Sequence, residues 1–423
     1  MIAAVGEQGY LKTTVADVHA RAGVSRKAFY EHFPNKEQCF LETHDAIVAE
    51  GLARVTHAYE TAEGALNGVD AGIEALFERA IENPHALRLI LVEIGAVGPA
   101  GIERRERLIT AYEQLLRENL GLAPGPGTIP NPILRAIVGG LSTVLYARVQ
   151  SRRQTQLRKL IPDLVWWLTS YYSAPEVLMT LQDPRPSHPS AGLMGGRAPG
   201  TLWPHPTSNR RRGLRGEHTG SHSFVVHNQR ERILDAVANL SATKGYAAVT
   251  VKDIAEAAAV SLDAFYEHFT GKEDAFLVAY EVGHGRGLAI VQRAYDAAPD
   301  WRTGIRAAIV ALFDFLASEP AFAHMALVDA MIATSRTAER ALKGVTIYAQ
   351  MLVPGLEEAS KGQEPPPVTI EAIAGGIFEL CLSYTLQKRI VELSELVPRA
   401  TYFALAPFVG AEEARRIASE SLD

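Results

Sequence analysis

Cysteine is almost absent from this 423-residue sequence, which contains only Cys39 and Cys381, far apart along the chain. Two distant cysteines exclude a disulfide framework. Without a CxxC pair or a His/Cys cluster, they also exclude the common zinc sites. This usage is typical of a reducing compartment. We therefore expect a cytoplasmic protein that holds neither a metal nor a cofactor.

The sequence also lacks a strong excess of one charge and lacks long hydrophobic runs. Its formal net charge of -6 excludes only a uniformly basic surface, because DNA-binding charge can be confined to one face. The longest apolar runs, such as residues 87–97, are broken by charges and are too short to span a membrane. No signal-peptide pattern occurs at the start. We expect no membrane partner.

Enzyme motifs are missing as well. The sequence has no nucleophile elbow, no phosphate-binding loop and no Rossmann fingerprint, and its histidines are scattered. We therefore do not expect an enzyme.

What the sequence does contain is one long internal repeat. Residues 9–41 (GYLKTTVADVHARAGVSRKAFYEHFPNKEQCFL) align without a gap with residues 245–277, at an offset of 236 residues. The same offset pairs Gly139-Gly140 with Gly375-Gly376. A repeat of this length in constant register indicates a duplicated domain rather than a solenoid.

The spacing of apolar residues predicts an all-α protein, because they recur every three or four residues and no period-2 alternation is sustained. Between the repeats, a stretch rich in Pro, Gly, Ser and Arg predicts a flexible linker. The predicted domains are a first helix-turn-helix domain (1–48), a first helical body (49–182), the linker (183–228), a second helix-turn-helix domain (229–284) and a second body (285–423).

The first repeat has the pattern of a helix-turn-helix. Thr14 and Asp17 resemble a capping box that opens a helix. Gly23 supplies a turn that needs a positive φ. Ser25 can cap a second helix that begins at Arg26. Two short helices joined by a tight turn with glycine form the geometry that reads DNA.

These residues resemble the N-terminal domain of TetR-type transcriptional repressors. Gly-Tyr, Thr-Thr-Val, Ala-Gly-Val-Ser, Phe-Tyr-x-His-Phe and Lys-Glu occur in order at residues 9–41, and close variants keep the same spacing at 245–277. Elsewhere the resemblance is only architectural, to the family's helical ligand-binding and dimerisation body. It implies two tandem TetR-like units, each with a three-helix DNA-binding domain and a body. It leaves open whether the bodies pair within one chain or between two.

The resemblance also implies which residues contact a double-stranded DNA operator. In each unit, the start of the second helix would meet base edges, while a Thr, a Tyr, a His and a Lys would contact phosphates. The residues of the first unit are Thr14, Ser25, Arg26, Lys27, Ala28, Tyr30, His32 and Lys36. Those of the second unit are Thr250, Ser261, Leu262, Asp263, Ala264, Tyr266, His268 and Lys272. A helix dipole disfavours a cation at Lys36, which favours an external anion over a solvated surface lysine.

The two reading helices differ in character. Leu262 and Asp263 replace Arg26 and Lys27, and Ala259 replaces the turn glycine. A positive φ at an alanine costs roughly 1 kcal/mol. An acid repels phosphate, although it can accept a hydrogen bond from cytosine N4. We favour a different half-site over a weakened DNA binder, because the second unit keeps all four phosphate-contact residues.

The first unit has a shortened first helix, because Met1 aligns with Val237 in the second repeat. We expect Phe29 and Val18 to be under-packed as a result, and a start assigned too far downstream would explain the shortening. Val24, Phe29 and Phe33 are otherwise predicted to be core residues.

Two features stand out in the helical bodies. The glycine pairs at 139–140 and 375–376 predict a close helix approach, which the resemblance implies is a four-helix interface completed by residues 160–172. Carboxylates also recur inside apolar runs, at Glu93 and Asp329. Each could face a ligand pocket, although a neighbouring arginine or helix terminus more often satisfies such a group.

The sequence therefore predicts a DNA-binding repressor that reads unlike half-sites and is released by an unknown small-molecule effector. The alternative is a small-molecule-binding regulatory protein whose DNA binding is weakened or lost.

Overall fold

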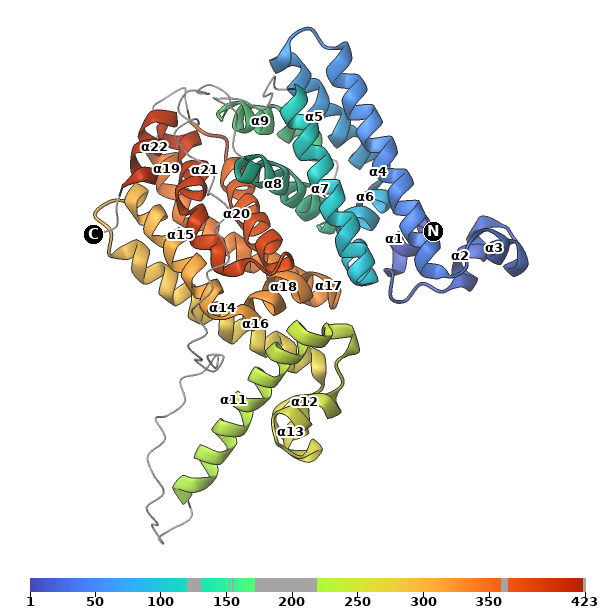
Figure 1. Ribbon diagram of the computed structural model, residues 1–423, viewed down its shortest axis with the longest axis vertical. Helices are drawn as coiled ribbons and strands as arrows, with labels where there is room; N and C mark the ends of the chain where they lie inside the picture. The colour runs from blue at the N-terminus through green and yellow to red at the C-terminus, as the bar shows by residue number, and fades with distance from the viewer. Residues whose placement is uncertain (120–130, 152, 154–155, 172–218, 359–363, 421–423) are drawn as a thin grey trace, which may run out of the picture.

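The computed structural model describes residues 1–119, 131–151, 153, 156–171, 219–358 and 364–420 (Figure 1). These residues form helices and contain no β-strand, which confirms the predicted all-α class. Most of the predicted linker, up to residue 218, lies outside the described residues.

The first unit consists of three short helices followed by a helical body. Its elements are α1 (Ile2–Gln8), α2 (Val15–Ala22), α3 (Arg26–His32), α4 (Lys36–Thr61), α5 (Ala65–Glu82), α6 (Pro84–Leu91), η1 (Glu93–Val97), α7 (Pro99–Asn119), α8 (Asn131–Gln150) and α9 (Leu157–Thr169).

The second unit repeats this order. Its DNA-binding domain and first long helices are α11 (Thr219–Lys244), η3 (Tyr246–Ala248), α12 (Val251–Ala257), α13 (Leu262–His268), α14 (Lys272–Asp296) and α15 (Trp301–Ser318). The rest of the body comprises α16 (Pro320–His324), η4 (Met325–Asp329), α17 (Ala330–Ile332), α18 (Ser335–Ala349), η5 (Gln350–Leu352), α19 (Val353–Glu357), α20 (Val368–Leu386), η6 (Ile390–Leu396), α21 (Val397–Val409) and α22 (Ala411–Ser419).

The helices do not stop at the predicted domain boundaries. Helix α11 begins at Thr219, so residues 219–228, which were predicted as linker, are helical. Helix α4 passes through the boundary at 48–49 without a break, and α14 does the same at 284–285. In each unit, one continuous helix therefore ties the DNA-binding domain to the body.

Helices α8 and α20 lie side by side between the two bodies (Figure 1). A Cβ added to Gly139 would lie 2.2 Å from the Cβ of Glu379, and one added to Gly375 would lie 2.5 Å from the Cβ of Thr143. The glycine pairs therefore permit the close approach predicted for them. The two contacts exchange under the 236-residue offset, as they would across a two-fold axis.

Aromatic side chains join α9 to α21 beside this helix pair. The ring of Tyr171 stacks on Phe403 with centroids 5.2 Å apart, and its hydroxyl donates to the Phe403 carbonyl at 2.8 Å. Trp167 occupies the position equivalent to Phe403, and the two ring centroids are 6.1 Å apart. Together, α8, α9, α20 and α21 make one buried four-helix junction within the chain.

The junction includes two helices that pass a length and composition test for a membrane span. These segments are Pro132–Val149 and Val368–Leu386, and 67% and 72% of them are buried inside the protein. They face each other and the remaining body helices, as core helices do.

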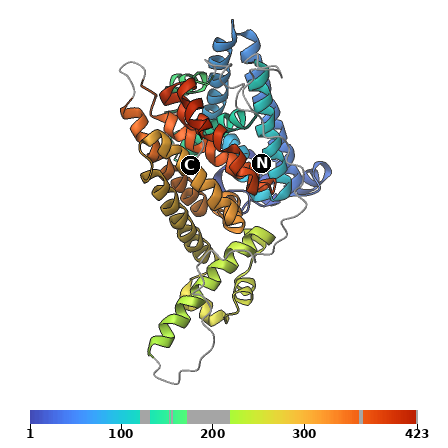
Figure 2. The same ribbon diagram turned by 60° about the vertical axis from the view of Figure 1, so that its left-hand side comes forward.

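The two helix-turn-helix domains project from the bodies at separate places (Figures 1 and 2). In the second domain, Phe265 and Phe269 belong to the same core cluster as both bodies. In the first, Phe29 belongs to a small separate cluster with Ala4, Val18 and Cys39. The first domain is therefore less integrated with the rest of the protein.

Candidate nucleic-acid interface and ligand cavities

Both helix-turn-helix domains open with the capping box that the sequence predicted. The Thr14 hydroxyl accepts from the Asp17 amide at 3.2 Å, and the Asp17 carboxylate accepts from the Thr14 amide at 2.8 Å. Thr250 and Asp253 repeat this arrangement. The Thr14 hydroxyl also donates to Asp17, at 2.7 Å. A phosphate contact by Thr14 stays a prediction, and it requires this proton to turn away from the carboxylate.

The corner between the two helices has the predicted backbone. Gly23 has φ 66° and ψ 25°, in the left-handed region. Ser25 then caps α3 by accepting from the Ala28 amide at 3.1 Å. In the second domain, Ala259 has φ 50°, so the strain expected there is present. The Nη1 atom of Arg232 in α11 lies 3.5 Å from the Ala259 carbonyl oxygen, which places a cation on this corner.

The first reading helix presents cations to solvent. Phe29 points inward and is 4% exposed, whereas Arg26 and Lys27 are exposed on the outer face. The Arg26 guanidinium lies 5.6 Å from the ring centroid of Tyr30. Lys27 makes only a long contact with Glu31, at 3.9 Å. Two cations on one exposed helical turn can donate to phosphates or to guanine edges.

The second reading helix presents a different surface. Ser261 caps α13 through the Ala264 amide at 3.1 Å, as in the first unit. Its outer face exposes Leu262 (46%), Tyr266 (57%) and the carboxylate of Asp263. The backbone frame is therefore shared, while the charge at the reading position is reversed.

The histidines predicted to contact phosphate are not equivalent in the structure. His32 is exposed, but His268 is half-buried and its Nε2 atom is inaccessible to solvent. His268 would need to turn before this nitrogen could meet a phosphate.

Lys36 and Lys272 both turn inward rather than toward an external anion. Lys36 Nζ donates to the Tyr10 carbonyl at 2.9 Å and lies 4.1 Å from the Tyr10 ring centroid. Lys272 Nζ donates to the carbonyls of Tyr246 and Val249, at 3.0 and 2.8 Å. Burial lowers the pKa of both ammonium groups. The helix dipole alone does not predict these carbonyl partners, and phosphate contact by either lysine stays a prediction.

Glu93 and Asp329 each accept a hydrogen bond from a backbone amide of the adjoining helix-turn-helix domain, which fits the alternative that such acids are satisfied within the protein. Ligand binding by either residue stays a prediction. Glu93 accepts from the Tyr10 amide at 2.8 Å and from Arg88 at 3.0 Å. Asp329 accepts from the Tyr246 amide at 3.0 Å and lies 3.1 Å from His324 Nδ1. These buried carboxylates fasten each DNA-binding domain to its body.

The residues expected to be under-packed in the first domain are not the exposed ones. Phe29 and Val18 both remain buried, at 4% exposure each. Val24, predicted as core, is instead 44% exposed. Its equivalent Val260 is half-buried and packs against the main core. The corner valine is therefore more exposed in the first domain than in the second, whereas the residues beneath the reading helix stay buried.

The sequence did not reveal a cavity inside the second body. This cavity has a volume of about 140 Å³, and the equivalent space in the first body is about 60 Å³. Comparing the repeats gives a partial signal, because the first unit has larger residues at three matched positions of the lining, although it has smaller ones at others, such as Ser142 for Phe378. The larger residues are Leu108 for Gly344, Val138 for Ala374 and Leu145 for Cys381.

The cavity in the second body is apolar with one polar end. Its lining contains no Lys, Arg, Asp or Glu side chain. At the polar end, His284 stacks on Tyr280 with centroids 5.6 Å apart and meets Tyr348 edge-on at 5.4 Å. Burial lowers the pKa of His284, an effect that the Gly344 backbone partly offsets. The imidazole is therefore neutral at neutral pH, and its buried Nε2 atom has no hydrogen bond of standard geometry.

Comparisons with known proteins match both helix-turn-helix domains. The family described as "Bacterial regulatory proteins, tetR family" matches residues 3–43 and 233–279. The chain is 31% identical over 88 residues to the HTH-type transcriptional activator FasR of Mycolicibacterium smegmatis, covering 21% of this chain and 40% of FasR. It is 26% identical over 116 residues to the nucleoid occlusion factor SlmA of Vibrio cholerae, covering 26% of this chain and 59% of SlmA.

The aligned segments therefore span less than two thirds of either relative. Among solved structures, the fatty acid degradation regulator FadR from Bacillus halodurans aligns at 23% identity and a TM-score of 0.38. That alignment covers 42% of this chain and 94% of FadR.

Proposed function

We propose that this chain, a TetR-type protein with two DNA-binding units, is a transcriptional repressor that binds an operator with unlike half-sites. One observation supports the proposal. The two helix-turn-helix domains have the same capped reading helix, but the first domain exposes Arg26 and Lys27 and the second exposes Leu262 and Asp263. An arginine or lysine pairs with guanine, whereas an aspartate can accept from cytosine N4. Two such faces specify different base pairs.

The test is a footprint of the DNA upstream of the protein's own coding region. The wild-type chain should protect one discrete, asymmetric site, with an affinity that falls as salt rises. Replacing Arg26→Ala and Lys27→Ala should weaken binding by about tenfold to a hundredfold and erase protection in one half-site. Leu262→Ala with Asp263→Ala should change base preference in the other half only.

A matched control removes the same charge elsewhere. Lys343→Ala with Lys388→Ala removes two exposed cations from the second body and should leave the footprint intact. Failure of the wild-type chain to protect any upstream fragment at low salt would contradict operator binding. It would favour the alternative of a ligand-binding protein with lost DNA binding, for which Asp263 and the strained Ala259 are the supporting observations.

We also propose that the effector is an apolar molecule with one hydrogen-bonding group, bound in the cavity of the second body. Ala326 and Leu327 line this cavity and belong to the π-helical turn η4. The last residue of η4 is Asp329, which holds the Tyr246 amide of the DNA-binding domain. A ligand that displaces η4 would therefore move the second reading domain.

Straight-chain alcohols from butanol to octanol serve as probes for this site. At least one should raise the melting temperature of the wild-type chain and weaken operator binding. Cys381→Leu, which copies Leu145 of the first unit, should abolish both effects, while Cys381→Ser should keep them. Equal responses from the Leu and wild-type chains would place the effector elsewhere.

Finally, we propose that one chain supplies both halves of the regulatory pair. The reciprocal contacts of Gly139 with Glu379 and of Gly375 with Thr143 support pairing within the chain. Light scattering should then give a mass near 45.9 kDa rather than twice that value.

A further inference from the structure

Two ion pairs cross the interface between the two bodies, and the cation of each pair comes from the same half. The first half contributes Arg105 and Arg148, and the second half contributes Glu379 and Glu371. We infer that this charge pattern makes the interface selective for unlike halves, so that a first half pairs with a second half and not with another first half. The inference rests on the intramolecular pairing proposed above and adds a mechanism that chooses the partner.

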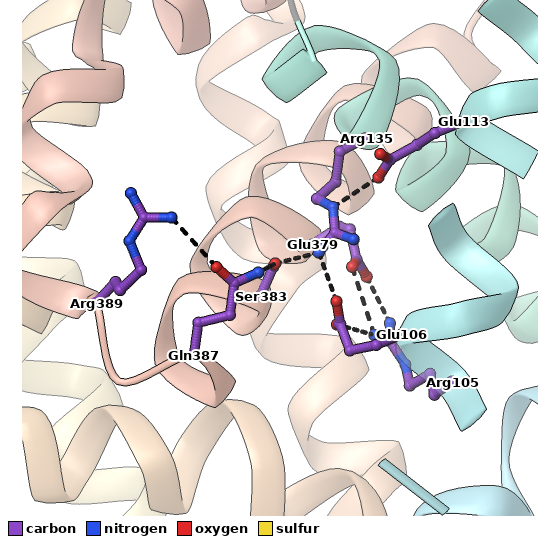
Figure 3. A network of polar contacts seen from close by, with 8 residues as sticks. All are labelled: Arg105, Glu106, Glu113, Arg135, Glu379, Ser383, Gln387 and Arg389. Atoms are coloured by element: carbon purple, nitrogen blue, oxygen red, sulfur yellow. Dashed lines mark hydrogen bonds and ion pairs between the residues drawn. The ribbon is translucent and has the colours of Figure 1, made fainter. Parts of the chain in front are cut away.

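The buried pair is the strongest element of this pattern (Figure 3). Glu379 on α20 is 2% exposed, and Arg105 on α7 reaches it with two contacts, at 2.5 and 3.4 Å. Burial alone would lower the pKa of Arg105, but the nearby carboxylate more than compensates and raises it. A buried carboxylate of this kind requires a cation, because leaving it unpaired is strongly unfavourable.

A second pair crosses the interface near the other end of α8. Arg148 donates two parallel hydrogen bonds to the Glu371 carboxylate, of 2.7 and 2.8 Å. This fork geometry is directional as well as charge-dependent. Beyond Glu379 along α20, Arg135 reaches across to Ser383 and also bonds Glu113 and Glu106 of its own half (Figure 3). The polar groups therefore form a band along the junction.

The 236-residue offset shows what a pair of like halves would contain. In a pair of first halves, Arg105 would face Thr143, the residue equivalent to Glu379. Arg148 would meet Arg135, the residue equivalent to Glu371. Neither cation would have the acid that it meets in this structure.

A pair of second halves fails for the opposite reason. Glu379 would face Ala341, which is equivalent to Arg105. Both copies of Glu379 in such a pair would then be buried without a cation. Glu371 would face Tyr384, which is equivalent to Arg148. Arg105 also lies 3.8 Å from Glu106 of its own half, but only the unlike pair gives each of these four charges an opposite partner across the interface. The glycine contacts, in contrast, are available to every combination.

The chain also contains its own neutral version of the buried pair. At the two positions related to Arg105 and Glu379 by the offset, the chain has Ala341 and Thr143. The double substitution Arg105→Ala with Glu379→Thr therefore copies a combination that the fold already accommodates. It removes the two opposite charges of the buried pair, which are part of the charge code (the pattern that gives the cations to the first half and the anions to the second), without placing an unpaired charge in the core.

The experiment measures partner choice after the intact chain has folded. A protease site is inserted after Gly200, the full-length protein is purified and cut, and the halves are diluted and reconcentrated. Native mass spectrometry then identifies the pairs, because the two halves differ in mass. For the wild-type sequence we expect only pairs of a first half with a second half. A substantial fraction of like pairs, about one in ten or more, would overturn the inference.

The matched variant combines Arg105→Ala and Glu379→Thr with Arg148→Ala and Glu371→Ala. Like pairs should now appear and approach the unlike pairs in abundance. If this variant still formed only pairs of a first half with a second half, the charge code would also be overturned, because the packing of the helices would then select the partner. In a separate arm, the single change Glu371→Arg should weaken pairing of the cut halves by at least about tenfold, and adding Arg148→Glu should restore most of it.

This design separates the inference from the proposal on which it depends. The mass of the uncut wild-type chain tests pairing within one chain. The identity of the pairs after cutting tests the charge code, whichever mass is found.

Discussion

The corner of the first helix-turn-helix is Gly23, with φ 66°, and the corner of the second is Ala259, with φ 50°. The first helix of the domain is seven residues long in the first unit (α1) and 26 residues long in the second (α11). The first domain thus has an unstrained corner and a short first helix. The second domain has a strained corner and a long first helix, and an arginine of that helix lies beside the corner.

Despite these differences, the two domains keep the same polar contacts to the backbone. Each has a Thr–Asp capping box, a serine cap on the reading helix and an inward lysine. A buried carboxylate on the adjoining body element holds the amide of a Tyr in each case. These shared contacts therefore define the backbone frame of each domain, and the residues on the outer face of the reading helix can change independently of that frame.

The largest expected effect comes from breaking the carboxylate anchors. Asp329→Ala removes the acceptor for the Tyr246 amide and should destabilise the attachment of the second domain by about 2–3 kcal/mol, because a buried donor is left unpaired. Hydrogen exchange at the Tyr246 amide measures this directly, and we expect it to lose its protection.

The matched change in the first unit is Glu93→Ala, which should expose the Tyr10 amide to exchange in the same way. Its cost should be smaller, about 2 kcal/mol, because Glu93 is less completely buried than Asp329. Asp329→Asn keeps an acceptor and serves as the control. An unchanged exchange rate at Tyr246 in Asp329→Ala would show that the carboxylate does not anchor the domain.

Much of the frame could be predicted from the sequence because its determinants are local. The capping box, the glycine corner and the serine cap each involve residues three or fewer positions apart, or a single φ angle. The glycine pairs were readable for a similar reason, since small residues at a fixed helical position indicate close packing.

The contacts that the sequence did not predict join residues that are distant along the chain. Glu93 lies 83 residues from the amide that it holds, and Lys36 lies 26 residues from its carbonyl. Nothing local in either segment identifies that partner. The Arg105–Glu379 pair spans 274 residues, and only the closed junction brings it together. The exposure of Val24 likewise depends on which helix covers it, a tertiary property.

A smaller effect is expected from exchanging the corner residues. Ala259→Gly should stabilise the second domain by about 0.5–1 kcal/mol, because glycine adopts the left-handed region without the cost of a Cβ. Gly23→Ala should destabilise the first domain by about 1 kcal/mol. No heavy atom lies within 4 Å of a Cβ built on Gly23, so this cost is conformational and not a clash. Denaturation of the two variants gives both values. A loss of stability in Ala259→Gly would mean that the corner is not strained.

The smallest expected effect concerns the two capping carboxylates. Asp253 accepts from Thr250 and also from Lys244, at 3.1 Å, which lowers its pKa to about 2. Asp17 accepts from Thr14 and from the neutral Gln8, at 3.2 Å, and its pKa is also lowered. Since both pKa values lie below 3.8 in the folded state, their stabilisation is present above pH 3.8. It is lost as pH falls through the folded pKa.

Because Gln8 and Lys244 occupy equivalent positions, exchanging them isolates the contribution of the lysine. Carbon-13 titration of the side-chain carboxyls should find Asp253 titrating near 2 and moving upward in Lys244→Gln, because a neutral amide stabilises the carboxylate less than an ammonium does. Gln8→Lys should move Asp17 downward. If Asp253 titrated near 3.8 in the wild-type chain, neither the cap nor the lysine would be holding its charge.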